Sequence, residues 1–124
     1  MPDTGRRVPR LRQRFPLRWT LGEHRLSGSG EIYDLSVNGL CFQIDREFPI
    51  PRDTRYLFTL EARDIPALPR HAFLRWFRQP QRRRGDVVTG FLCGATFRLD
   101  DPEVARAWTD WITARIAGAA PAPR

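Results

Sequence analysis

Apolar side chains alternate with other residues along several short segments, and this period of two constrains the fold more than any other feature. From Phe15 to Leu21 every second residue is apolar, which predicts a strand with one buried face. Residues 54–62 alternate in the same way, and residues 71–78 are apolar enough on both faces for a strand in a closed or covered sheet. The chain is therefore predicted to be mainly β.

Turn residues place a hairpin in the middle of this pattern. Residues 26–30 are expected to form a loop by composition, and residues 31–34 a short strand that follows it. Asn38 and Gly39 both tolerate positive φ and form a strong hairpin signal, after which residues 40–44 are predicted to leave as the paired strand.

A second hairpin is expected further along the chain. Residues 79–86 contain three successive arginines and are predicted to be a solvated hairpin tip. Its returning strand is predicted over residues 87–98, where Gly90 and Gly94 favour a bend or bulge. These segments give about six strands, the size of a small β-sheet domain.

The C-terminal segment carries helix signals instead. Asp101 is a suitable N-cap, Pro102 fits the first helical position, Glu103 complements the helix dipole, and Gly118 is expected to end the helix. One apolar stripe, expected to close an end of the barrel, is formed by Val104, Trp108, Trp111, Ile112 and Ile116. Docking of the two tryptophans on a partner protein remains the alternative.

Length and charge limit the class of protein. The chain has 124 residues, enough for one domain, and no apolar run of about 18 residues that could span a bilayer. The N-terminus lacks the apolar stretch of a secretory signal, so we expect a cytoplasmic protein. The net charge of +7 comes from arginine alone. Arginine binds phosphate and guanine bidentately, although codon usage explains the overall bias equally well.

The residues that commonly carry catalysis or metals form no recognisable set. Cys41 and Cys93 each lie in an apolar stretch and are expected to be free, buried thiols. His24 and His71 lack neighbours at metal-ligand spacing. The sequence shows no catalytic nucleophile with a neighbouring general base, and no phosphate-binding loop. We therefore expect no enzyme activity, no metal and no cofactor.

The segment from Asp34 to Gly39 reads Asp-x-Ser-x-x-Gly and is the most informative motif in the chain. The carboxylate of Asp34 and the hydroxyl of Ser36 can bind the donor edge of a purine. Gly39 can adopt positive φ and allow a ligand to approach the turn closely. The same residues also stabilise ordinary hairpin turns through local hydrogen bonds, which is the alternative interpretation.

Arginines cluster ahead of this motif. Residues 1–14 are expected to form a flexible arm, because the segment contains few apolar side chains. Arg6, Arg7 and Arg10 are the candidate contacts to a nucleotide, with Arg6 and Arg10 spaced as Arg-x-x-x-Arg. Arginine is so frequent here that this spacing alone carries little information, and the pair Arg10 and Arg14 is a competing assignment.

In this order, the arginine pair, the strand opening at Pro16, the Asp-x-Ser-x-x-Gly turn and the terminal helix resemble the PilZ domain family of bacteria, whose members are receptors for cyclic di-GMP. The resemblance covers most of the chain. It implies a six-stranded antiparallel β-barrel with a C-terminal α-helix over residues 15–118, followed by a disordered tail at 119–124. It also implies that the arm closes over a ligand held against the barrel.

The resemblance gives each motif residue a role in binding cyclic di-GMP. Asp34 and Ser36 would contact a guanine base, Arg6 and Arg10 the base and phosphates, and Arg7 a further phosphate. Binding would order the arm and so regulate a protein partner. Two alternatives remain. One is a basic β-barrel that binds RNA or DNA through arginines and exposed aromatic residues, and the other is a PilZ-like protein adaptor that binds no ligand.

Overall fold

The computed structural model describes residues 8–22, 25–44, 56–78 and 91–119. Within these ranges the chain forms strands and a single C-terminal helix, namely β1 (Phe15–Leu21), β2 (Leu26–Leu35), β3 (Gly39–Ile44), β4 (Leu57–Glu61), β5 (His71–Arg78), β6 (Phe91–Phe97) and α1 (Pro102–Ala119).

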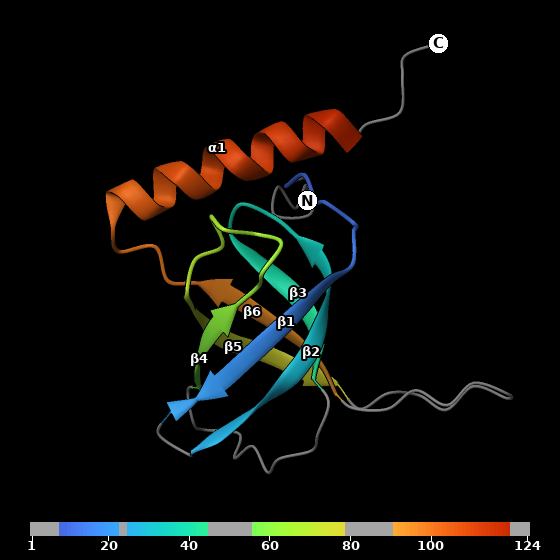
Figure 1. Cartoon of the computed structure of the whole chain (residues 1–124), viewed down its shortest axis with the longest axis vertical. Coiled ribbons are helices and arrows are strands. Elements are labelled where there is room, and N and C mark those ends of the chain that lie inside the picture. Colours follow the sequence, from blue (N-terminus) through green and yellow to red (C-terminus); the bar gives the residue numbers. More distant parts are fainter. Residues whose placement is uncertain (1–7, 23–24, 45–55, 79–90, 120–124) are drawn as a thin grey trace, which may run out of the picture.

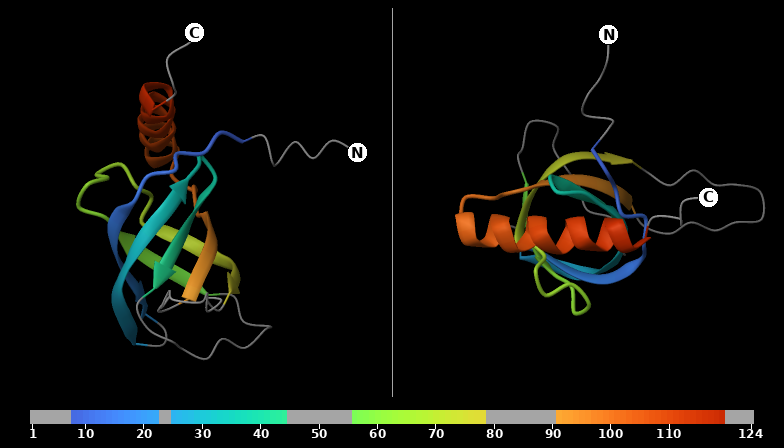
Figure 2. Two further views of the ribbon diagram at one scale, coloured as in Figure 1. Left: turned by 90° about the vertical axis from the view of Figure 1, so that its right-hand side faces the viewer. Right: turned by 90° about the horizontal axis from the view of Figure 1, so that it is seen from above.

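The strands close into a barrel in the order β1-β2-β3-β6-β5-β4, and every neighbouring pair is antiparallel. Helix α1 lies across one end of this barrel (Figure 1), and the view from above shows it spanning the opening (Figure 2). The predicted six-stranded antiparallel barrel with a C-terminal helix is confirmed. Because a closed barrel has no free edges, every described strand is paired on both sides.

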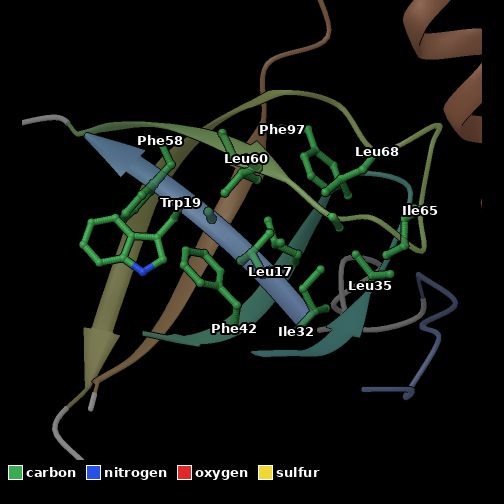
Figure 3. Packing of buried hydrophobic residues seen from close by; sticks show 14 of the residues in the cluster. Leu17, Trp19, Ile32, Leu35, Phe42, Phe58, Leu60, Ile65, Leu68 and Phe97 are labelled. Atoms are coloured by element: carbon green, nitrogen blue, oxygen red, sulfur yellow. The ribbon is translucent and has the colours of Figure 1, made fainter. Parts of the chain in front are cut away.

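The interior of the barrel is packed with aromatic and aliphatic side chains (Figure 3). Phe58 contacts both Trp19 and Phe42 edge to face, with ring centroids 6.0 and 5.3 Å apart. The alternation predicted for β1 is observed, because Phe15, Leu17, Trp19 and Leu21 are all buried while the residues between them are exposed. The period-two pattern therefore identified the inward face of this strand correctly.

The second strand is longer than the sequence suggested. Residues 26–30 were expected to form a loop, but β2 begins at Leu26, and its residues 26–32 pair with β1. A Cβ at Gly30 would overlap the backbone carbonyl of Gln43 on β3. Gly30 therefore permits close packing of two strands and does not mark a loop.

Helix α1 begins as predicted. The Asp101 carboxylate caps it, because Oδ1 accepts the backbone N–H of Glu103 at 2.9 Å. Trp108 and Ile112 are buried against the barrel, as expected of the apolar stripe. Val104 was wrongly assigned to that stripe, since it is 39% exposed, and the helix continues through Gly118 to Ala119.

Some predictions fall on residues outside the described ranges: the hairpin tip at 79–86, the first part of the strand predicted at 87–98, and residues 120–124 of the tail predicted at 119–124. The first residue of that tail, Ala119, belongs to α1 instead. In the described part of the chain, no helix is both long and apolar enough to cross a bilayer.

Candidate functional site

The Asp-x-Ser-x-x-Gly motif forms the connection between β2 and β3. The Ser36 side chain organises it, because its Oγ accepts the backbone N–H groups of Asn38 at 3.3 Å and Gly39 at 3.2 Å. The Ser36 backbone N–H donates to the Gly39 carbonyl at 2.9 Å. Ser36 is almost buried, at 9% exposure, so its hydroxyl fixes the shape of the turn.

The asparagine and glycine of this turn do not have the role that was predicted from their tolerance of positive φ. Among the described non-glycine residues only Arg25 has positive φ, and Gly39 does not adopt positive φ either. A Cβ at Gly39 would instead overlap the carbonyl oxygen of Ala95 on β6. Gly39 is therefore required by the close approach of two strands.

The N-terminal segment reaches the motif at Leu11. The Leu11 N–H donates to the Leu35 carbonyl at 2.7 Å, the Leu35 N–H donates to the Leu11 carbonyl at 2.9 Å, and Leu11 is 2% exposed. This bridge places Arg10 beside Asp34, with Nη1 lying 3.5 Å from both carboxylate oxygens. Two groups separated by 24 residues in the sequence therefore meet at one place.

The arginines of this segment differ in their surroundings. The guanidinium of Arg14 lies over the ring of Tyr33, 4.9 Å from its centroid, and its Nη1 is 3.3 Å from a carboxylate oxygen of Glu31. Arg14 thus contacts the outside of β2, whereas Arg10 contacts the motif. This placement favours Arg10 over Arg14 as the arginine next to Asp34. Arg6 and Arg7 lie outside the described residues.

Strand register extends the site across four neighbouring strands. Asp34 on β2 is opposite Cys41 on β3, Cys41 is opposite Gly94 on β6, and Gly94 is opposite Trp76 on β5. Directly opposed residues share a face of the sheet, so these residues form one row on the outside of the barrel. The row ends at an aromatic ring, because a Cβ at Gly94 would overlap the indole of Trp76.

Two register shifts among the described strand pairs border this row. One lies between Ile32 and Asp34 on β2, and the other between Leu74 and Trp76 on β5. Such bulges twist a strand locally and redirect side chains, and they are common next to binding sites. Each bulge here is followed immediately by an end of the row, Asp34 or Trp76.

A cavity of about 180 Å³ opens over the row. It is lined by Arg10, Asp34, Ser36, Asn38, Gly39, Leu40, Cys41, Arg75, Trp76, Gly94, Ala95 and Thr96. The cavity therefore brings together Arg10 and all three motif residues that the sequence singled out. Sequence reasoning missed Arg75 and Trp76 as site residues, because only strand register places β5 beside the motif. It missed Cys41, which lies on β3, because this residue was interpreted as a buried thiol.

The cysteines are both free thiols, as expected, but they differ in position. Cys41 lines the cavity and is half-buried; burial above all, and then the charge of Asp34, raises its pKa to about 11. Burial raises the pKa of Cys93 to about 12. Both thiols are therefore protonated at neutral pH. No group of three metal-ligating side chains occurs among the residues that the structure describes.

A larger cavity of about 520 Å³ lies on the side of helix α1, lined by Gln13, Trp111, Ala114, Arg115 and Gly118. None of the described residues that line it belongs to the motif, and Arg115, the charged side chain among them, lies 5.4 Å from the centroid of the Trp111 ring. We therefore take the smaller cavity as the candidate site, since it combines acidic, basic, hydroxyl and aromatic groups.

Comparison with solved structures supports the barrel assignment. The PilZ domain with c-di-GMP of YcgR from Escherichia coli aligns with a TM-score of 0.60, over 86% of this chain and 91% of that chain, at 17% sequence identity. No family model and no curated protein matches the sequence. The likeness shows that this chain has a PilZ-type fold, a six-stranded antiparallel barrel with one C-terminal helix.

Proposed function

We propose that the protein is a receptor for cyclic di-GMP and that the cavity over the motif is its binding site. The observation that carries the proposal is the meeting of Arg10 with Asp34 at that cavity. A solvent-exposed pair such as this contributes little to stability, about 0–1 kcal/mol, so folding alone gives a weak reason for it. The negative charge of Asp34 matches the hydrogen-bond donors of a nucleotide base, and the positive charge of Arg10 matches its phosphates.

The chemistry of the site fits guanine. The Asp34 carboxylate has two acceptor oxygens for the N1 and N2 donors of a guanine base. Arg10 can bind phosphate or the O6 and N7 acceptors with its planar fork. Its 3.5 Å contact with Asp34 is long, so a ligand can replace it at small cost.

Trp76 supplies a surface for stacking. Its indole lies against Gly94 at the end of the row and is 43% exposed. The indole ring lines the cavity and already packs on the barrel surface at Gly94, which has no side chain. The Trp76 side chain therefore loses little conformational entropy when a base stacks on it. The proposed roles are thus an edge contact from Asp34, a charged contact from Arg10 and a face contact from Trp76, with Ser36 and Gly39 shaping the turn.

The proposed output is ordering of the N-terminal arm. Leu11 is already paired with Leu35, so the ordering step is assigned to the residues that precede it. Arg6 and Arg7 are proposed to contact the ligand phosphates, and this contact would change the surface that a protein partner recognises.

Isothermal titration with cyclic di-GMP tests the proposal. Wild-type protein should bind, and Arg10→Ala should lose about 1.5–3 kcal/mol of binding free energy, on the order of ten- to a hundredfold in Kd. Arg12→Ala is the matched control, because Arg12 is an exposed arginine on the same segment that does not line the cavity. Equal affinities for the two variants would contradict the proposed site, and no binding by wild type would leave the adaptor and nucleic-acid alternatives.

One observation favours binding of single-stranded nucleic acid as a second candidate. Trp76 and Phe77 are both more than 40% exposed on β5, and the guanidinium of Arg78 lies 5.4 Å from the Trp76 ring centroid. Aromatic residues beside arginines stack on bases with little sequence preference. This reading leaves the carboxylate of Asp34 without a role.

A further inference from the structure

We infer that Trp108 is a positioning residue for the binding turn and that it couples helix α1 to the ligand. This inference rests on the proposed function and adds a regulatory element to the same site. Trp108 lies outside the cavity and is fully buried, at 0% exposure, so its role would be exerted through the turn.

The coupling contact is one hydrogen bond between distant parts of the chain. The Trp108 indole Nε1 donates to the backbone carbonyl of Val37 at 3.1 Å, across 71 residues of sequence. Val37 lies in the middle of the Asp34–Gly39 motif, between Ser36 and Asn38. The helix therefore binds the backbone of the turn. The Val37 side chain takes no part in this hydrogen bond.

The turn is also held from the sheet. The Asn38 carbonyl accepts the Phe97 N–H at 2.8 Å, and the Gly39 carbonyl accepts the Ser36 N–H at 2.9 Å. Together with Val37, three successive carbonyls are fixed in three directions: towards the helix, towards β6 and across the turn. Without the hydrogen bond from Trp108, the Val37 carbonyl would lack its hydrogen-bond donor. The turn would then populate other conformations in which this carbonyl is bonded.

Trp108 is in turn fixed within the helix and its surroundings. Its ring stacks on Trp111 with centroids 5.5 Å apart at 13°, and it meets Phe97 edge to face at 5.2 Å. Phe97 thus contacts the turn through its backbone and Trp108 through its ring. These contacts link the turn to α1 without a break, so we expect a shift of the turn to change the packing of Trp108.

Linkage makes the effect reciprocal. If cyclic di-GMP binds one conformation of the turn more tightly, then contacts from the helix that stabilise this conformation raise the affinity for the ligand. The factor by which the helix contacts raise ligand affinity equals the factor by which the ligand strengthens the helix contacts. When only a fraction of molecules has the competent turn, the apparent Kd rises by the inverse of that fraction. Trp108 therefore sets affinity without touching the ligand, and ligand binding is transmitted to α1.

The test compares two identical substitutions on one helix. Trp108→Phe keeps an aromatic ring but removes the donor to Val37, whereas Trp111→Phe reduces the same stack and leaves that hydrogen bond in place. By titration with cyclic di-GMP, Trp108→Phe should raise Kd at least about fivefold, in the range of measured coupling, and Trp111→Phe less than about twofold. Folding of both variants is checked by circular dichroism at the titration temperature.

Indole N–H resonances in wild-type protein give a second readout that needs no substitution. Titration with cyclic di-GMP should shift the Trp108 indole signal as well as the Trp76 indole and the Gly39 amide, which report the cavity. Shifts at Trp76 and Gly39 with an unchanged Trp108 signal, together with equal affinities of the two variants, would overturn the coupling while the receptor function stands. Absence of all shifts and of binding heat would remove the receptor function and the inference with it.

Discussion

Single residues at the site have separable roles, and the clearest contrast is between Trp76 and Phe77. They are adjacent on β5 and nearly equally exposed, at 43% and 41%, but only Trp76 lines the cavity. Trp76→Ala should therefore weaken cyclic di-GMP binding by about 1–3 kcal/mol, the range measured for stacking of a base on an aromatic ring. Phe77→Ala should have little effect in the same titration. A larger loss from Phe77→Ala would place the ligand elsewhere on β5.

Cys41 provides a chemical report on the same cavity. Its pKa of about 11 means that the reactive thiolate is scarce at neutral pH, so alkylation should accelerate about tenfold for each pH unit up to that value. Saturating cyclic di-GMP should slow the reaction, because the ligand would cover the cavity that Cys41 lines.

Mass spectrometry after timed alkylation measures this protection. Cys93 is fully buried and should react only when the protein unfolds, so it serves as an internal control for folding. Ligand binding detected by titration without any protection of Cys41 would mean that the cavity is not the binding site.

At the scale of elements, the close approach of β3 to β6 limits the size of the side chain that position 39 can accommodate. Gly39→Ala places a Cβ on the Ala95 carbonyl, a backbone atom that cannot rotate away. The variant should lose about 1–3 kcal/mol of folding stability, as overpacking typically costs. Thermal denaturation measures the loss.

Gly118→Ala is the matched control for this change. A Cβ there meets nothing within 4 Å, and the residue lies inside α1. Alanine should therefore stabilise the helix by up to about 1 kcal/mol, since glycine is the poorer helix former. A Gly39→Ala variant as stable as wild type would show that the two strands separate easily.

Helix α1 links the turn to the end of the barrel. Its N-terminus is fixed by the Asp101 cap, and its middle by Trp108 in contact with the turn. The two tryptophans of the predicted stripe therefore pack on the protein's own structure: Trp108 is fully buried, and Trp111 contacts Phe15 at 6.4 Å. Docking of both on a partner protein, the alternative raised from the sequence, is inconsistent with this burial of Trp108.

At the scale of the whole molecule, charge separates the receptor from a nucleic-acid-binding barrel. The net charge of +7 would favour any polyanion, but a ligand with two phosphates can neutralise few arginines. The logarithm of the cyclic di-GMP binding constant should therefore fall with the logarithm of salt concentration with a slope of about two or less. A short single-stranded RNA titrated at the same salt concentrations is the comparison. Steep salt dependence with RNA and no binding of the dinucleotide would favour the nucleic-acid alternative.

Patterns local in sequence predicted much of this molecule. The alternation of β1 and the start of α1 follow from side-chain periodicity and capping, which act over a few residues. The extent of β5 was predicted correctly from its apolar composition, but residues 75–78 are exposed, so this strand is not covered on both faces along its length. The resemblance to PilZ domains led us to expect Asp34 and Arg10 at one site, and the Leu11–Leu35 bridge brings these two side chains together. That bridge was not foreseen, because Leu11 is an isolated apolar residue among arginines.

What only the tertiary structure decided are the features that depend on which strands are neighbours. Gly30 and Gly39 were interpreted through their backbone freedom, but each is required because another strand passes too close for a Cβ. Trp76 joined the site only because β5 pairs with β6, which pairs with β3. The sequence by itself determined most of the strands, the start of the helix and the chemical groups of the motif, since these depend on nearby residues, but it did not determine the first half of β2. Barrel closure decided which of those groups share a surface, since this depends on contacts between residues far apart in the chain.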